Sequence, residues 1–352
     1  MKAKRSGRSP LRLVIDATNV GTKVTGMERY LQVLIAGLCE ARFQSFAVAT
    51  SRTSCLANVG GRVIAGPRSR ELAQQIWLPS LVRGLRPKLV LEASVGASLR
   101  MQTSKVTLLH DDLPWNLPDL AGKRTRVYGR WTWERSLTST WNHGVVGVTD
   151  ISRAVAQRLG VPFLGATGLT VSQPVAPVPV NVGGEYVLTV GTLEPRKNIS
   201  ALIAAFESFV ADGGRPRQLV IVGRRGWQSP PARSTFVRVL GHVSDPELWW
   251  LYQNATLFIC PSLYEGFGIP VLEAYTAGVI VCVAVSRVPS AGLIYAGDPD
   301  AIINIEDPED VTQLVRALRE GVGKTRKGPN VVAPARPSRV AQAFINIVKP
   351  WL

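Results

Sequence analysis

The sequence predicts an α/β protein made of two doubly wound, Rossmann-like domains in tandem. The chain has 352 residues, 46% of them hydrophobic. This length is greater than a single domain with one hydrophobic core usually has. Short apolar runs alternate with segments of helical periodicity, and this alternation stops at one Pro- and Gly-rich stretch and then restarts. Buried strands that alternate with helices specify parallel sheets covered on both faces. We therefore expect two such domains with a cleft between them.

The first half of the chain begins this alternation. The apolar run LRLVIDA has strand length, and the next segment repeats Tyr30, Leu31, Leu34, Ile35 and Leu38 at helical spacing. The pattern continues to residue 160. We expect strands at 11–17, 45–50, 62–66, 88–93, 105–112 and 144–150, and helices at 27–40, 69–85 and 151–160.

The second half repeats the pattern after the uncharged stretch VSQPVAPVPVNVGG. This composition is typical of a linker. We expect strands at 186–191, 218–223, 237–243, 256–262, 279–285 and 301–305, and helices at 199–212, 245–255, 270–278 and 308–321. The predicted organisation is an N-terminal acceptor-binding domain at 1–170, a linker at 171–184, a C-terminal donor-binding domain at 185–335, and a last helix at 336–352 that crosses back to the first domain.

The net charge of +16 is uneven along the chain. Residues 1–180 hold 24 Lys and Arg against 10 Asp and Glu, whereas residues 181–352 hold 17 against 15. Nucleic acid, an anionic membrane surface or an acidic ligand would each suit the basic half. The stretch 122–136 mixes arginines with Tyr128, Trp131 and Trp133. It fits either an interfacial helix on lipid headgroups or a surface helix with its tryptophans in the core.

The composition also bears on location. Cys39, Cys55, Cys260 and Cys282 are scattered without metal-ligand spacing, which indicates buried, reduced thiols in a cytoplasmic compartment. The amino terminus begins like a signal peptide, but Asp16 interrupts its apolar run, so we do not expect export. The sequence contains no run of eighteen apolar residues, so we do not expect a membrane-spanning helix.

Ligands of parallel sheets bind beyond the carboxyl ends of the strands, so the loops there are the candidate sites. After strand 186–191, Arg196 and Lys197 stand just before a helix that Asn198 could cap. Two cations beside a helix amino terminus suit an anion such as phosphate. The alternative is an exposed basic pair in a turn.

After strand 256–262, the stretch PSLYEGFGIPVLEA places Glu265 in a Gly-rich turn and Glu273 in the following helix. Gly266 and Gly268 permit close backbone approach, and Pro270 fits the first turn of a helix. Taken alone, Glu273 could merely complement the helix dipole, and Glu265 could be a solvated loop residue. Paired carboxylates also serve glycoside hydrolysis, but a neighbouring cation pair would then have no purpose.

Together these loops resemble a known family. VGTLEPRKN followed by LYEGFGIPVLEAYTAG is similar to the donor half of retaining GT-B glycosyltransferases of family GT4, whose signature is two glutamates separated by seven residues. HDDLPWNLPD and GVTDISRAVAQRLGV resemble stretches of that family's first domain. The resemblance covers nearly the whole chain, and it is strongest to bacterial mannosyltransferases of surface polysaccharide assembly.

The resemblance implies roles for particular residues. Arg196 and Lys197 would bind the diphosphate of a nucleotide sugar, Glu265 the hydroxyls of the transferred sugar, and Glu273 the ribose. His110 would approach the sugar, although a lone histidine is more often structural. The implied catalytic residues are His110, Arg196, Lys197 and Glu265, and the implied donor-binding residues are Gly21, Gly26, Arg196, Lys197, Glu265, Gly266, Phe267, Gly268, Ile269, Leu272 and Glu273.

The implied reaction transfers a hexose with retention of configuration and needs no metal, because the two cations stabilise the leaving diphosphate. The resemblance favours mannose from GDP-mannose and a glycan or lipid-diphosphate-linked acceptor at the inner face of the cytoplasmic membrane. A UDP-sugar or a deoxyhexose is the alternative donor or sugar. Asp111 and Asp112 do not have the spacing of a metal-binding transferase motif. Residues 286–300 depart from the family pattern and receive no role.

Three other functions remain open from the sequence. A nucleic-acid-binding protein would explain the charge, but no nucleic-acid module is recognisable, so we expect no nucleic-acid partner. A non-catalytic nucleotide-sugar-binding protein would keep the ribose and phosphate residues. A sugar-nucleotide epimerase would use the same architecture without an acceptor.

Overall fold

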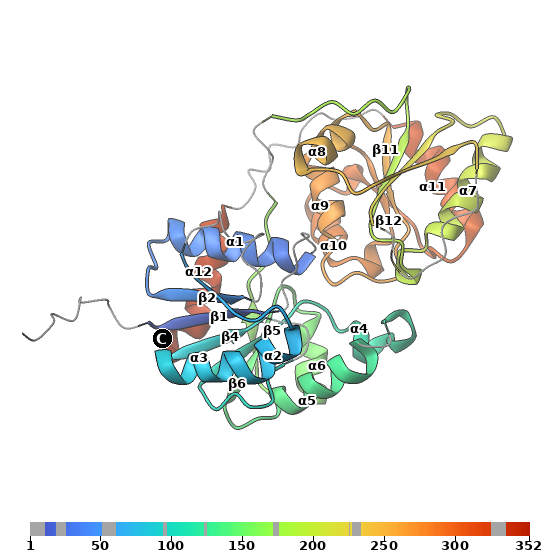
Figure 1. The fold of residues 1–352 in the computed structure, drawn as a ribbon. Coiled ribbons are helices and arrows are strands. Elements are labelled where there is room, and N and C mark those ends of the chain that lie inside the picture. Colours follow the sequence, from blue (N-terminus) through green and yellow to red (C-terminus); the bar gives the residue numbers. More distant parts are fainter. Residues whose placement is uncertain are drawn as a thin grey trace, which may run out of the picture. The chain divides into compact units, whose positions relative to one another are not determined.

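The computed structural model describes residues 11–18, 26–50, 61–93, 97–122, 125–171, 176–224, 226, 234–324 and 336–352. Contacts divide the chain into two compact units. Unit 1 comprises Met1–Thr170 and Ala335–Leu352, and unit 2 comprises Val171–Pro334. Figure 1 shows a sheet flanked by helices in each unit.

The described part of unit 1 forms a seven-stranded sheet in the order β3-β2-β1-β4-β5-β6-β7. All neighbouring strands are parallel. The strands are β1 (Leu13–Ala17), β2 (Phe46–Thr50), β3 (Arg62–Ala65), β4 (Leu89–Glu92), β5 (Lys105–Leu109), β6 (Asn142–Gly147) and β7 (Phe163–Ala166). The first six confirm the strands expected in this half, and β7 was not expected because FLGA is short and lacks alternation.

Helices cover both faces of this sheet, with α1 and α12 on one face and α3 and α5 on the other (Figure 1). The helical segments are α1 (Gly26–Glu40), α2 (Arg70–Leu72), η1 (Ala73–Trp77), α3 (Leu78–Leu85), α4 (Leu113–Asn116), η2 (Pro118–Leu120), η3 (Thr125–Gly129), α5 (Arg130–Leu137), α6 (Ser152–Arg158), α12 (Pro337–Val348) and η7 (Lys349–Trp351). The helix expected at 69–85 is present, but η1 inserts a π-helical turn into it.

The aromatic residues of the basic stretch 122–136 are divided between the core and the surface. Trp133 is buried and stacks on Trp115, with ring centroids 5.4 Å apart. Trp131 and Tyr128 are exposed. The core interpretation is therefore right for Trp133 and wrong for Trp131, because these residues lie on opposite faces of α5.

The last helix packs on unit 1. Phe344 and Val348 of α12 are fully buried. A Cβ on Gly37 of α1 would lie 2.1 Å from the Pro337 carbonyl oxygen, so glycine permits the close crossing of α1 and α12. The Arg12 guanidinium donates to the Leu352 backbone oxygen at 2.8 and 3.0 Å, which links the end of the chain to the start of β1.

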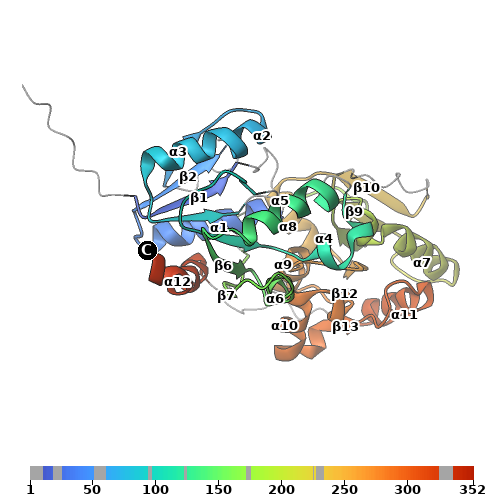
Figure 2. The same cartoon turned by 90° about the horizontal axis from the view of Figure 1, so that it is seen from below.

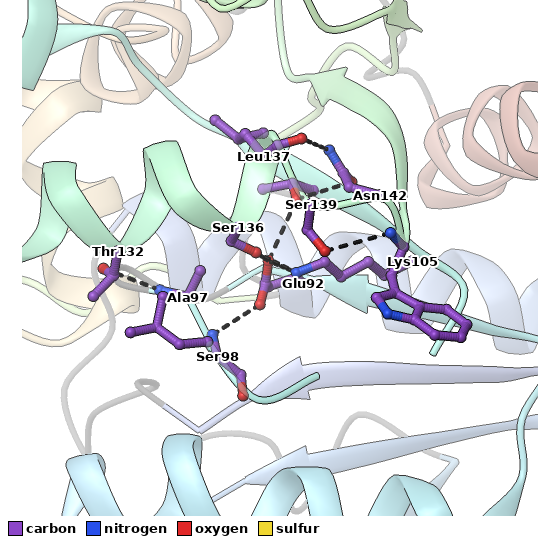
Figure 3. A network of polar contacts seen from close by, with 12 residues as sticks. Glu92, Ala97, Ser98, Lys105, Thr132, Ser136, Leu137, Ser139 and Asn142 are labelled. Atoms are coloured by element: carbon purple, nitrogen blue, oxygen red, sulfur yellow. Dashed lines mark hydrogen bonds and ion pairs between the residues drawn. The ribbon is translucent and has the colours of Figure 1, made fainter. Parts of the chain in front are cut away.

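A buried polar network joins the sheet of unit 1 to α5 (Figure 3). The Glu92 carboxylate is fully buried and lies 3.2 Å from the Lys105 ammonium. The Ser136 hydroxyl donates to Glu92 at 2.6 Å, and the backbone N–H of Ser98 donates to it at 2.9 Å. Since a buried charge is tolerated only when paired and hydrogen-bonded, this network fixes α5 to β4 and β5.

Unit 2 forms a six-stranded parallel sheet in its described residues, in the order β10-β9-β8-β11-β12-β13. The strands are β8 (Val187–Val190), β9 (Leu219–Val222), β10 (Val237–Gly241), β11 (Leu257–Cys260), β12 (Val281–Val283) and β13 (Ile302–Asn304). These confirm the six strands expected in this half, and the two parallel sheets confirm the predicted fold class.

The helices of unit 2 lie in two layers. The helical segments are η4 (Pro195–Lys197), α7 (Ile199–Ala211), α8 (Asp245–Asn254), α9 (Ile269–Thr276), η5 (Val285–Arg287), α10 (Pro289–Gly297), η6 (Pro299–Ala301) and α11 (Val311–Val322). Alternate residues of each strand face opposite layers: Phe258 packs with α8, α9 and α10, whereas Leu257 and Ile259 pack with α7 and α11. Helix α10 was not among the predicted helices, and its Pro, Ser and Gly residues are typical of a loop.

The stretch expected to be a linker makes contacts with unit 2. Val182 is buried in the core that contains α8, and the Val178 N–H donates to the Pro246 carbonyl at 3.1 Å. Among the described cysteines, Cys260 and Cys282 are buried as expected, but Cys39 is exposed near the end of α1. In the described residues, no helix combines the length and apolar character that crossing a membrane requires.

Candidate active site

Two loops at the carboxyl edge of the unit 2 sheet bring the predicted cations and carboxylate together. Arg196 and Lys197 lie in η4, after β8, and Glu265 follows β11, the next strand in the sheet. The Leu263 N–H donates to the Arg196 carbonyl at 2.8 Å, which ties the two loops together. Neighbouring parallel strands thus place side chains separated by 68 residues in one cluster.

Glu265 bridges the two cations. One carboxylate oxygen lies 2.9 Å from the Arg196 guanidinium, and the other accepts from the Lys197 ammonium. The Ser262 hydroxyl also donates to Glu265, at 2.7 Å, and Glu194 lies 2.9 Å from Arg196. Lys197 and Glu265 are both buried, so the cations are not an exposed basic pair in a turn.

The environment of Glu265 holds it ionised. Burial alone would raise its pKa, but the charges of Lys197 and Arg196 and the hydrogen bonds from Lys197 and Ser262 outweigh burial and lower the pKa to about 2. Glu265 is therefore an acceptor for hydrogen bonds at neutral pH. The cluster can pair a carboxylate with hydroxyl groups while its cations attract an anion.

Asn198 does not have the expected capping role. It adopts a left-handed conformation with φ of 53°, and its side chain makes no capping hydrogen bond to α7. Its Nδ2 donates instead to the Pro308 carbonyl at 2.6 Å. The tertiary contact therefore determines the orientation of this side chain, which local sequence could not reveal.

The Gly-rich turn leads directly into α9. Gly268 has φ of 89°, and a Cβ there would lie 2.3 Å from Val288 Cγ1, so both conformation and space require glycine. Residues 286–300, which received no role from the sequence, support this turn. The Ser290 hydroxyl donates a hydrogen bond to the Gly268 carbonyl at 2.8 Å. The other predicted residues differ in exposure, with Phe267 buried and Gly266, Ile269 and Leu272 partly buried.

Glu273 lies on α9, the helix that follows the turn containing Glu265. It is 3% exposed and accepts a hydrogen bond from the Tyr252 hydroxyl of α8 at 2.9 Å. Tyr252 is fully buried, so its hydroxyl fixes the carboxylate between two helices. The sequence gave no reason to select Tyr252, because it lies in a helix of mostly apolar residues.

A separate group of candidate residues lies at the carboxyl edge of the unit 1 sheet. His110 follows β5, and its ring lies edge-on to the Tyr30 ring with centroids 5.5 Å apart. The Tyr30 hydroxyl shares a hydrogen bond of 2.9 Å with Thr167, which follows β7. Gly26 is the first residue of α1, and the prediction for Gly21 lies outside the described residues.

His110 is a neutral hydrogen-bond acceptor. Burial lowers its pKa to about 4, although the Glu28 charge and a hydrogen bond with the Ala93 backbone act in the opposite direction. Nε2 is buried and has no hydrogen-bond partner among the described residues, so Nδ1 is the nitrogen that donates to Ala93. At neutral pH, Nε2 can therefore accept a hydrogen bond from a hydroxyl group.

Tyr30 and Glu28 are functional candidates that the sequence reading did not select. Tyr30 was read only as an apolar residue of α1, and Glu28 received no role. The signal for Glu28 was the spacing TGMERY, in which a charged residue enters the first turn of a mostly apolar helix. Its burial, at 5% exposure, and its charge beside His110 appear only in the fold.

The described residues contain no group of three or more His, Cys, Asp or Glu side chains that could hold a metal ion. Asp111 and Asp112 instead stabilise the start of α4. Asp111 accepts from the Leu113 N–H at 3.3 Å, and Asp112 accepts from the Asn116 side chain.

Residues 176–327 match the sequence model of the family described as "Glycosyl transferases group 1". They form a glycosyl transferases group 1 domain. Arg196, Lys197, Glu265 and Glu273 all lie within this group 1 domain, whereas His110 lies outside it. The family resemblance of the two loops is therefore confirmed for residues 176–327.

Curated relatives of this chain include O-antigen chain mannosyltransferase B of Escherichia coli, which is 38% identical over 138 residues. That alignment covers 37% of this chain and 34% of the relative. The serotype-specific mannosyltransferase WbdA of Escherichia coli is 29% identical over 180 residues, covering 48% of this chain and 21% of the relative. The chain thus spans about a third or less of the curated relatives that it matches.

Solved structures show that the group 1 domain is part of a GT-B fold. Sucrose-phosphate synthase from Thermosynechococcus elongatus has a TM-score of 0.65 at 17% identity and covers 97% of this chain and 94% of its own. A putative UDP-N-acetylglucosamine 2-epimerase from Listeria monocytogenes has a TM-score of 0.58 at 13% identity, covering 98% of this chain and 97% of its own. Fold alone therefore does not separate a transferase from an epimerase.

Proposed function

We propose that the chain is a retaining glycosyltransferase that transfers a hexose, mannose from GDP-mannose, to a glycan or lipid-linked oligosaccharide acceptor in polysaccharide biosynthesis. The observation that carries this proposal is the cluster of Arg196, Lys197 and Glu265 in a group 1 domain. It combines cations suited to a diphosphate with a carboxylate suited to sugar hydroxyls. Both relatives bear the name mannosyltransferase, one of them for the O-antigen chain, and these names support mannose as the sugar.

In the proposed reaction, the bond from the anomeric carbon to the diphosphate oxygen breaks, and a bond from that carbon to the acceptor oxygen forms on the same face. The proton of the acceptor hydroxyl passes to the departing diphosphate. Arg196 and Lys197 stabilise the charge that develops on this leaving group, and the protein supplies no nucleophile. A metal ion is not required in this proposal, because the two cations fill its electrostatic role.

The other site residues bind the donor in this proposal. Glu273 accepts hydrogen bonds from the ribose hydroxyls, with Tyr252 holding its carboxylate. Glu265 accepts from hydroxyls of the transferred sugar, and the neutral His110 accepts from a hydroxyl through Nε2. The backbone of the turn at Gly266–Gly268 and the start of α9 approach the phosphates.

We also propose a cytoplasmic location, at the inner face of the cytoplasmic membrane, where lipid-diphosphate-linked acceptors would be met. The basic excess of residues 1–180 supports attraction to an anionic leaflet. It equally favours encounter with anionic donors.

The first test measures the melting temperature of the chain with guanosine, uridine and adenosine diphosphates and with their sugars, with and without excess EDTA. We expect GDP and GDP-mannose to stabilise the chain in both conditions, by about 2.7 kcal/mol at a hundred times the dissociation constant. If only UDP-sugars stabilise the chain, the donor is a UDP-sugar and not GDP-mannose. Absence of any stabilisation would contradict the nucleotide-sugar site.

The second test incubates the chain with the stabilising donor and lipid-diphosphate-linked oligosaccharides, and determines the anomeric configuration of the product by NMR. Retention is the expected result, and inversion would refute the proposed same-face route. Conversion of the donor without any acceptor would favour the epimerase, and binding without conversion would favour a non-catalytic binding protein.

A further inference from the structure

Large apolar side chains gather on one outer face of unit 1. Six of the eleven large hydrophobic residues exposed in the described part of the chain lie on three segments: α2–η1, residues 97–100 and η3–α5. Single exposed hydrophobic residues are ordinary, but a concentration of them marks an interaction surface. We call this set the apolar patch: Leu72, Ile76, Leu99, Val127, Tyr128 and Trp131.

The three segments of the apolar patch are joined by hydrogen bonds. Gln75 of η1 donates its Nε2 to the Ala97 carbonyl at 2.9 Å and accepts from the Leu99 N–H at 3.0 Å. The Ala97 N–H in turn donates to the Thr132 hydroxyl of α5 at 3.3 Å. Helices α2 and α5 are neighbours in both Figure 1 and Figure 2, in agreement with this chain of contacts.

The inner face of α5 is fixed, so its outer face cannot easily turn inward. Ser136 donates to the buried Glu92 carboxylate, and Thr132 accepts from Ala97, as Figure 3 shows. Trp133 lies in the core on the same inner side. Trp131 is therefore held outward with 48% of its surface exposed.

The apolar patch lies at the carboxyl edge of the unit 1 sheet. The α2–η1 segment begins after β3, and η3 begins after β5 and α4, so the first turns of both helices lie at the edge where their strands end. His110 also follows the end of β5. The patch and His110 thus lie at the same edge of the unit 1 sheet.

Two arginines lie beside residues of the apolar patch. The Arg135 guanidinium lies over the Trp131 ring, 5.6 Å from its centroid, and the exposed Arg100 follows Leu99. Residues 61–136 hold thirteen Lys and Arg against six Asp and Glu. Arginines beside exposed aromatic and aliphatic side chains are typical of surfaces that enter a lipid headgroup layer.

We propose that the apolar patch is the surface by which the chain docks on an anionic lipid bilayer, with Trp131 and Val127 entering the headgroup region. This inference deepens the membrane contact proposed above and assigns it to particular residues. A second copy of the chain fits less well, because a two-fold interface would bring two basic faces together. Docking at this edge would present a lipid-linked acceptor to the His110 side of unit 1.

The chain offers a matched pair of tryptophans for the test. Trp131 and Trp141 are 48% and 45% exposed, but Trp141 directly precedes β6 and so lies at the opposite, amino edge of the sheet. The full chain, its Trp131→Ser variant and its Trp141→Ser variant are floated with vesicles of phosphatidylcholine alone and of phosphatidylcholine with phosphatidylglycerol in equal parts. Val127→Ser replaces the first variant if Trp131→Ser does not fold by circular dichroism.

We expect binding to the anionic vesicles only, weakened by salt, with a loss of about tenfold or more in Trp131→Ser and none in Trp141→Ser. Equal binding of the two variants, or no binding of the unmodified chain, would overturn the proposal. A Trp131-dependent dimer in ultracentrifugation without vesicle binding would overturn it in favour of self-association. The melting temperature of the same samples is also measured with nucleoside diphosphates. Because the proposed nucleotide-binding residues lie in unit 2, stabilisation by a nucleotide without vesicle binding would contradict the docking proposal but not the proposed function.

Discussion

Replacing Glu265 with Gln removes the charge that neutralises Arg196 and Lys197 while keeping the shape of the side chain. Glu265 is 6% exposed, and its pKa falls from an ordinary 4.5 to about 2. At about 1.36 kcal/mol per pKa unit, this shift corresponds to roughly 3 kcal/mol of stability at pH 7. Loss of one partner from a buried ion pair costs a similar amount, about 3 to 5 kcal/mol.

The sign of the pH dependence follows from the lowered pKa of Glu265. A carboxyl group with a lower pKa in the folded state stabilises fully above its unfolded pKa of 4.5, and loses this contribution as the pH falls toward about 2. The difference between the unmodified chain and Glu265→Gln should therefore shrink to about 2 kcal/mol at pH 3.5.

The assay is urea denaturation at pH 7 and at pH 3.5, followed by hydrogen exchange of peptides from β8 and β11, which reports on unit 2 separately from unit 1. Glu194→Gln is the control, because the Glu194 carboxylate pairs with Arg196, whereas the Glu265 carboxylate bridges both cations. We expect it to cost roughly 1 kcal/mol or less. The reasoning is refuted if the two variants cost the same at pH 7, or if the cost of Glu265→Gln does not change at pH 3.5.

Three further predictions concern the remaining site residues. Arg196→Ala or Lys197→Ala should lower kcat in a donor-turnover assay by about 100- to 1,000-fold through the leaving group, and an unchanged kcat would remove the assignment. Tyr252→Phe removes one hydrogen bond to the Glu273 carboxylate and should raise the dissociation constant of the nucleoside diphosphate by about two- to tenfold in calorimetry, whereas equal affinity would leave Tyr252 a structural residue. Because burial lowers the pKa of His110 to about 4, the unfolded chain binds its proton first, so stability falls as the pH drops from 6.5 to about 4. In His110→Asn, the melting temperature should fall less between pH 6.5 and pH 4 than in the unmodified chain. An equal fall in both would contradict the role of His110 in this pH dependence.

Local pattern was sufficient for most elements of the fold. Strand β11 reads as an apolar run, and α7 reads as a helix, because burial on both faces of a parallel sheet leaves a direct trace in the sequence. The pattern failed at α10, whose Pro, Ser and Gly residues are typical of a loop. Local propensity does not favour a helix there. Val288 and Ser290, at the start of α10, pack against the turn at Gly268, and this tertiary contact supports the helix.

The sequence by itself determined that this chain has two parallel α/β sheets and that Arg196, Lys197 and Glu265 belong to loops after strands, because strand spacing and turn residues are local properties. Only the tertiary structure decided that Glu265 bridges the two cations, that Tyr252 holds Glu273, and that Trp131 faces outward while Trp133 faces the core. These facts depend on distances between residues far apart in the chain and on the rotation of a helix about its axis. Periodicity records which residues share a face, but it does not record what that face meets.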